Sequence, residues 1–148
     1  MIDEVLYMEA RIIRQFCQKY DMAPKAVNEL FEKFQIWDYI ESCYDSLHTA
    51  GDEYVLSEIS DILRGKGLML FSIGSIENKI FKSMNTCADM ILADAIEDYA
   101  REENLSRAEA RSLILNSKAY ECLYDFETNL WMEGPDYFID FFRKCSLA

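Results

Sequence analysis

The residues best suited to chemistry lie around the only histidine of the chain. His48 stands in the stretch LHTAGDEYVLSEI, residues 47–59, and Asp52 and Glu53 follow it closely. An imidazole titrates near neutral pH, and a neighbouring carboxylate can stabilise its charged form, so this grouping would suit general acid–base catalysis. The other interpretation is that the stretch is a junction between two helices.

A second stretch of the chain favours the junction. LWMEGPDYFIDFF, residues 130–142, repeats a leucine, a glycine and a tyrosine of the first stretch at an offset of 83 residues: Leu47 and Leu130, Gly51 and Gly134, Tyr54 and Tyr137. In this alignment Trp131 takes the place of His48. Because an indole ring cannot act as an acid or a base, this replacement indicates packing rather than catalysis. The sequence therefore predicts no catalytic residue.

Motifs of common catalytic and cofactor sites are absent from the sequence. It contains no phosphate-binding GxxxxGK[ST] loop, no GxGxxG fingerprint, no GxSxG elbow and no ExxH pair. A single histidine cannot build a multi-histidine metal site. We expect no metal, no cofactor and no enzymatic activity.

The net charge of the chain is strongly negative. The 27 acidic residues outnumber the 15 basic ones and give a formal net charge of −12 at pH 7. This charge repels phosphate backbones, so we expect no nucleic-acid partner, and it favours a basic protein. The longest apolar run, GLMLFSIG at residues 67–74, is too short to cross a bilayer, which takes about 20 residues. We expect no membrane contact.

The cysteines and the N-terminal residues indicate a reducing compartment. The five cysteines are odd in number and form no CxxC pair. The first residues, MIDEVLYMEARII, carry acids where a signal peptide would carry bases. We expect a cytoplasmic protein with free, mostly buried thiols.

Apolar residues recur at helical spacing along most of the chain, and each set would form the apolar face of an amphipathic helix. One such set predicts a helix that runs from Ile36 through Cys43 to Leu47. Residues 10–62 also align without a gap onto residues 93–145. We therefore predict an all-α fold of two similar four-helix modules in tandem, packed into one body. Module A spans residues 1–64, a connector with the start of a long helix spans 65–86, and module B spans 87–148.

Local signals predict how several helices begin. Pro24, after Ala23, suits the first turn of a helix, and the equivalent helix of module B begins with the capping-box pattern of Ser106 and Glu109. Ser75 can cap a long helix that runs to about Glu103. The segment LMLFSI, residues 68–73, is left open between strand, helix and loop.

Aromatic residues are concentrated in the third and fourth helices of each predicted module. The same helices carry acids where a nucleic-acid groove would carry Lys and Arg. Aromatic side chains supply much of the affinity at protein interfaces. The residues predicted to bind a protein partner are Trp37, Tyr44, His48, Trp131 and Tyr137.

The first module also resembles a known family. Residues 30–40, LFEKFQIWDYI, fit the pattern L-F-x-K-x-x-[IV]-x-D-Y-[IL], and a Tyr-Asp-x-Leu-His-Thr segment follows at residues 44–49. In these two segments the first module is similar to the bacterial domain-of-unknown-function family three-seven-nine-one, and the similarity covers about the first 60 residues. The second module resembles short proteins from the same loci, although Trp131 and Met132 replace the His-Thr pair. Such genes often lie beside predicted ADP-ribosyltransferase-like proteins (family three-nine-nine-zero), so the resemblance implies an antitoxin-like or immunity-like protein.

The sequence thus leaves two classes of function. The favoured one is a non-enzymatic binding protein that masks a basic ADP-ribosyltransferase-like toxin with an acidic, aromatic face. The alternative is a small enzyme or regulator that uses His48 with Asp52 or Glu53. Homo-oligomerisation is left open.

Overall fold

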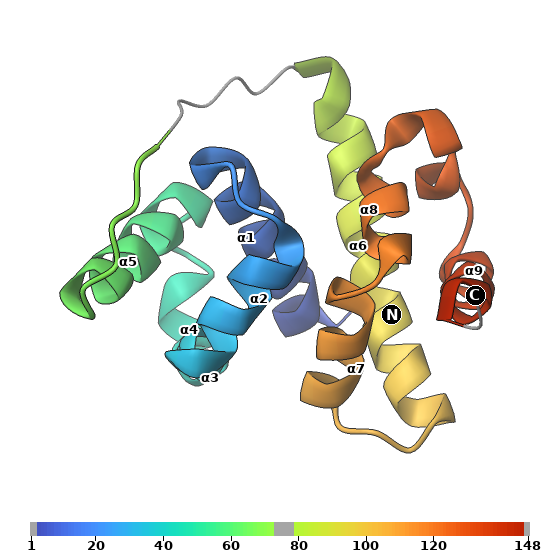
Figure 1. Cartoon of the computed structure of the whole chain (residues 1–148), viewed down its shortest axis with the longest axis horizontal. Helices are drawn as coiled ribbons and strands as arrows, with labels where there is room; N and C mark the ends of the chain where they lie inside the picture. The colour runs from blue at the N-terminus through green and yellow to red at the C-terminus, as the bar shows by residue number, and fades with distance from the viewer. Residues whose placement is uncertain (1–2, 73–78, 147–148) are drawn as a thin grey trace. The chain divides into compact units, whose positions relative to one another are not determined.

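The computed structural model describes residues 3–72 and 79–146, and every regular element within these ranges is helical (Figure 1). This confirms the predicted all-α class. None of the helices in these ranges combines the length and apolarity that a bilayer crossing requires. The elements are, in order, α1 (Glu4–Tyr20), α2 (Pro24–Lys33), α3 (Ile36–Ser42), α4 (Tyr44–Leu47), α5 (Asp52–Gly65), α6 (Lys79–Glu102), α7 (Arg107–Leu115), α8 (Lys118–Tyr124), the 3-10 helices η1 (Phe126–Thr128) and η2 (Leu130–Met132), and α9 (Pro135–Ser146).

The chain divides into two compact units. Residues 11–76 form the first, called here the N-terminal unit, and residues 1–10 with 77–148 form the second, the C-terminal unit. The predicted boundaries kept residues 1–64 together, whereas in the structure residues 1–10 group with the C-terminal helices. Two arginines of α7 hold them there: Arg111 Nη1 lies 3.0 and 3.1 Å from the two carboxylate oxygens of Glu9, and Arg107 Nη1 lies 2.8 Å from Asp3 Oδ2.

Aromatic rings form the core of the N-terminal unit. The ring of Phe16, from α1, meets that of Phe31, from α2, edge-on at 5.2 Å, and Phe31 meets Trp37, from α3, at 5.0 Å. The Trp37 indole Nε1 donates a 3.0 Å hydrogen bond to Asn28 Oδ1, so the one polar atom of the buried ring is satisfied. Trp37 is therefore a core residue.

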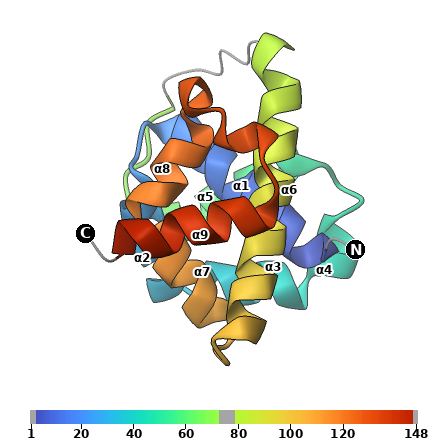
Figure 2. The ribbon, with the colours of Figure 1, turned by 90° about the vertical axis from the view of Figure 1, so that its right-hand side faces the viewer.

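The long helix α6 organises the C-terminal unit. It packs against α7, α9 and η2, and α8 packs against α9 (Figure 2). The rings of Tyr99, on α6, and Phe142, on α9, meet edge-on at 5.1 Å. The buried Asp89 of α6 accepts a 2.6 Å hydrogen bond from the Tyr124 hydroxyl at the end of α8, which gives this buried carboxylate a partner.

Helix boundaries recur at the offset of 83 residues. The second helix starts at Pro24 in one unit and at Arg107 in the other, and the last helix starts at Asp52 and at Pro135. The first helices end alike: Asp21 and Asn104 both have left-handed backbones, with φ of 50° and 55°. The following residues close the same turn, because Met22 N donates to Cys17 O and Leu105 N to Ala100 O. The superposition of residues 10–62 on 93–145 stays a prediction.

The third helix of each predicted module departs from expectation. In the N-terminal unit it breaks at Cys43, so α3 and α4 replace the continuous helix that the spacing predicted. In the C-terminal unit α8 gives way to η1 and η2, which meet at Asn129, a residue with a left-handed φ of 61°. Cys43 has a negative φ of −106°, whereas Asn129 is left-handed, and apolar spacing alone reveals neither interruption.

The predicted capping box of α7 and part of the connector can be compared with the structure. The capping box of α7 is confirmed: Glu109 N donates to Ser106 Oγ at 3.0 Å, and Ser106 N donates to Glu109 Oε1 at 3.3 Å. The predicted cap Ser75 and the residue Ile73 lie outside the described residues. Residues 68–72 adopt neither helix nor strand, and the Leu70 carbonyl accepts a 3.1 Å hydrogen bond from Arg64 Nη2.

Candidate functional site

His48 lies at the C-terminal end of α4, with its side chain exposed to solvent. Its ring stacks on that of Tyr44 at a centroid distance of 4.8 Å and an interplanar angle of 15°. Its Nδ1 lies 2.8 Å from the Tyr44 carbonyl oxygen. The same carbonyl accepts a 2.9 Å hydrogen bond from the His48 backbone N–H, so the contacts of His48 are local contacts at a helix terminus.

Asp52, the carboxylate that the alternative function pairs with His48, is held by α1. Arg11 donates to its two oxygens from Nε at 3.0 Å and from Nη2 at 3.2 Å, and Gln15 Nε2 donates at 2.7 Å. Burial by itself raises the pKa of Asp52, but these hydrogen bonds and the charge of Arg11 outweigh it and hold the pKa below its ordinary value. Asp52 therefore has an evident structural role, joining the start of α5 to α1.

The five cysteines carry free thiols, and the expectation that most of them are buried is wrong. Cys87 is exposed and the other four are only half-buried. Burial raises the pKa of the Cys17 thiol to about 12, so this thiol stays protonated and unreactive at neutral pH. Within residues 3–72 and 79–146, no three His, Cys, Asp or Glu side chains are grouped so as to hold a metal ion.

The N-terminal unit carries an acidic surface around an exposed tyrosine. Residues 34–63, which include α3, α4 and most of α5, contain no lysine or arginine. Tyr54 is 51% exposed. The charge of Glu58, one turn further along α5, and its hydrogen bond with the tyrosine raise the pKa of Tyr54. Burial and then the charge of Glu58 raise the pKa of Tyr39, on α3. We call Tyr39, Glu53, Tyr54 and Glu58 the Tyr54 surface.

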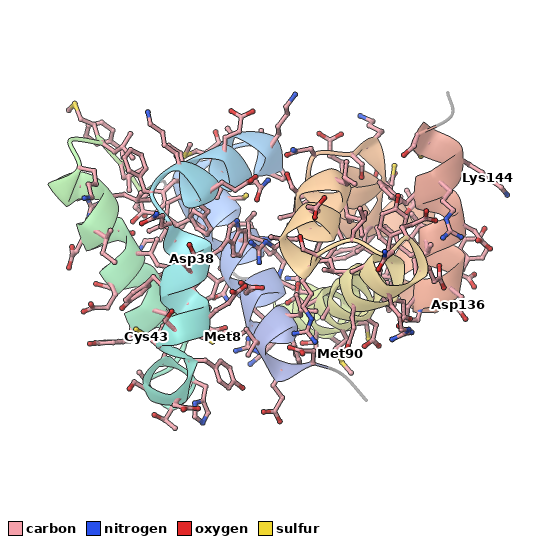
Figure 3. The ribbon with its side chains drawn as sticks, turned by 90° about the horizontal axis from the view of Figure 1, so that it is seen from below. Met8, Asp38, Cys43, Met90, Asp136 and Lys144 are labelled. Carbon is pink, nitrogen blue, oxygen red and sulfur yellow. The ribbon has the colours of Figure 1, made fainter. Side chains whose placement is uncertain are left out.

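The C-terminal unit carries a similar surface at the start of α9. Residues 119–142 contain no lysine or arginine. Tyr137 is 54% exposed. Glu133, Asp136 and Asp140, its near neighbours in the sequence, are exposed too, and Asp136 lies on the outer side of α9 (Figure 3). We call Glu133, Asp136, Tyr137 and Asp140 the Tyr137 surface.

The two predicted tryptophans differ in their availability to a partner. Trp37 is 3% exposed and belongs to the core, so we correct its assignment as a contact residue. From α3, Trp37 contacts Phe31 and Asn28. Apolar spacing shows that a ring lies on the apolar face of its helix, but it does not show whether the ring is buried in the core or exposed at the edge of that face. Trp131 is half-buried, and its Nε1 donates a 3.3 Å hydrogen bond to the Phe126 carbonyl.

Of the other predicted binding residues, Tyr44 and His48 are brought together by their stacking in the N-terminal unit, and Tyr137 is exposed in the C-terminal unit. The prediction missed Tyr54. The repeat contained the signal for it, because Tyr54 aligns with the predicted Tyr137.

One comparison with known proteins gives a match. Residues 8–66 match the family model described as "Protein of unknown function (DUF3791)", which confirms the resemblance of the first module. The match covers less than half of the chain and corresponds to α1–α5. Neither the curated proteins nor the solved structures contain a match to the chain.

Proposed function

We propose that this chain is a non-enzymatic binding protein that masks a basic protein partner, and that it acts in the bacterial cytoplasm. The resemblance of the first module to a family whose genes adjoin ADP-ribosyltransferase-like proteins suggests that partner. The chain would then act as its antitoxin or immunity protein.

The observation that carries the proposal is the exposure of one tyrosine in each unit within a long segment that has no basic residue. Tyr54 and Tyr137 are about half exposed, and both lie among acidic side chains. Tyrosine supplies a large contact area at a low cost in conformational entropy, and it is enriched among the residues that dominate binding energy.

The charge pattern suggests how masking would work. An ADP-ribosyltransferase must hold the phosphates of a dinucleotide, which requires positive charge in its cleft. A chain with a net charge of −12, and with two acidic surfaces in segments that contain no lysine or arginine, is electrostatically complementary to such a cleft. Covering the cleft would exclude the nucleotide, without any chemistry by the covering protein.

Co-expression tests the proposal. The chain is produced with an adjacent ADP-ribosyltransferase-like protein, and growth rescue and co-purification are scored. We expect both with the wild-type chain, and loss of both with the double variant Tyr54→Ala, Tyr137→Ala. The matched control is Leu113→Ala, which removes an exposed large side chain from α7, outside both acidic surfaces. A chain that neither rescues growth nor co-purifies, or a double variant as active as the control, contradicts the proposal.

A further inference from the structure

Tyr54 and Tyr137 occupy the same place in two equivalent helices. Each is the third residue of its helix, α5 from Asp52 and α9 from Pro135, and their exposures are 51% and 54%. Exposed side chains vary freely in size and type when they serve only solubility. The recurrence of one large exposed ring at the same position therefore points to a shared use.

The residues behind each tyrosine fix its position. The next two residues are buried in both helices: Val55 and Leu56 after Tyr54, and Phe138 and Ile139 after Tyr137. These anchors fix the rotation of each helix about its axis, because residues on one helix keep constant angular spacing. Each ring is thus presented at the surface by a buried apolar face and does not depend on a mobile loop.

A carboxylate lies one helical turn beyond each ring. Glu58 follows Tyr54 by four residues, and Asp140 follows Tyr137 by three, so each acid is a neighbour of its tyrosine on the helix surface. The charge of Glu58 raises the pKa of the Tyr54 hydroxyl, in keeping with this spacing. Each unit therefore pairs an exposed π face with an anion about one turn away.

This pairing suits a guanidinium group. Arginine stacks its planar cation on an aromatic face and donates two parallel hydrogen bonds to a carboxylate, whereas lysine carries a compact, strongly hydrated charge. We propose that each unit holds one arginine-docking point, formed by Tyr54 with Glu58 in one unit and by Tyr137 with Asp140 in the other. This inference rests on the proposed function, and the chain would engage two arginine side chains of its partner. The two points act independently.

A peptide titration tests this inference without the natural partner. The probe is acetyl-Gly-Arg-Gly-Arg-Gly-amide, added at low salt to the whole chain with isotope-labelled tyrosine and followed by NMR of the tyrosine rings. The variants Tyr54→Phe and Tyr137→Phe assign the two signals, because each removes one of them. We expect both signals to shift, and the buried Tyr120 to stay unchanged.

Two controls make the result specific. The same peptide with citrulline in place of arginine keeps the shape and loses the charge, and it should bind at least about tenfold more weakly, as expected for loss of a cation–π contact and an ion pair. Glu58→Gln should weaken the shift of Tyr54 alone, and Asp140→Asn that of Tyr137 alone. We expect both variants to keep the fold, because the new side chains have nearly the size of the half-buried Glu58 and the exposed Asp140 that they replace.

The outcomes separate this inference from the proposed function. Equal shifts with the citrulline peptide, or shifts unaffected by the two acid variants, overturn the arginine-docking points. A shift at only one tyrosine overturns the two-point arrangement. If the chain nevertheless rescues growth and co-purifies with the transferase, the masking function stands and only its contact chemistry is different.

Discussion

Glu9 and Arg111 are a buried ion pair, with exposures of 1% and 4%. Burying two charges costs several kcal/mol of desolvation, which their contact must offset. The pair joins residues 102 positions apart and ties the first turns of α1 to α7 within the C-terminal unit. At the residue scale, this contact and that of Asp52 with Arg11 join helices that are distant in the sequence.

Breaking the buried pair should destabilise the chain strongly. Glu9→Gln leaves Arg111 buried without its carboxylate, so we expect the free energy of unfolding, measured in urea, to fall by about 3–5 kcal/mol. The control is Asp98→Asn, which breaks the more exposed pair with Arg101 and should cost at most about 1 kcal/mol. Equal effects of the two changes would show that the buried pair adds nothing specific.

The Asp52 contact should make stability depend on pH. Its folded pKa lies below the ordinary value of 3.8, so its contribution is present above pH 4 and is lost as the pH falls through the folded pKa. Asp52→Asn should therefore cost about 1–3 kcal/mol of unfolding free energy at pH 7 and progressively less below pH 4. Glu53→Gln is the matched control, since it removes a charge from the same turn of α5 and leaves the Arg11 contact in place. A constant difference between wild type and Asp52→Asn from pH 7 to pH 2 would contradict this linkage.

Replacement of His48 should have little effect. The ring is exposed, and its stacking and its hydrogen bond are with Tyr44, so we expect His48→Ala to change partner affinity by no more than about 1 kcal/mol in a calorimetric titration. Complete loss of function with an unchanged circular dichroism spectrum would instead support the alternative in which His48 is a catalytic or regulatory residue.

At the scale of the element, two equivalent helices begin with different devices. α7 has a complete capping box, whereas α2 begins at Ala23 and Pro24 with no side-chain cap. The backbone of Ala23 already has the extended conformation of a capping residue, with φ of −68° and ψ of 144°. A serine at position 23 could therefore cap α2 as Ser106 caps α7.

Removing the serine cap of α7 and adding one to α2 should change the unfolding free energy in opposite directions. Ser106→Ala removes a cap and should lower the unfolding free energy by about 1 kcal/mol, and Ala23→Ser should raise it by a similar or smaller amount. Thermal unfolding of both variants measures the two effects. Loss of stability in Ala23→Ser would mean that the first turn of α2 does not offer a free backbone donor to a serine.

At the scale of the whole molecule, the charge of −12 should govern encounter with the proposed basic partner. Long-range attraction to a basic protein is screened within about 8 Å at physiological salt, whereas contacts already formed are screened less. Raising the salt concentration should therefore slow association more than it speeds dissociation, which stopped-flow or surface-based kinetics can measure. An association rate that is independent of salt would argue against a basic partner.

The amino-acid sequence determined the helical class and the capping box of α7. These features depend on contacts between residues close in the chain, and apolar spacing and local side-chain chemistry report such contacts directly. The same local signals placed the starts of α2 and α7 within the sequence. They also identified Tyr137, which the structure leaves exposed.

Only the tertiary structure decided which residues pack together over long separations. It removed Trp37 from the candidate surface, joined Glu9 to Arg111, and engaged Asp52 with Arg11. It also left Tyr54 exposed beside Glu58. The burial of a side chain and its contacts depend on how helices from distant parts of the chain pack together. The apolar pattern of one helix specifies which face turns inward, but it does not specify which residues of other helices that face contacts.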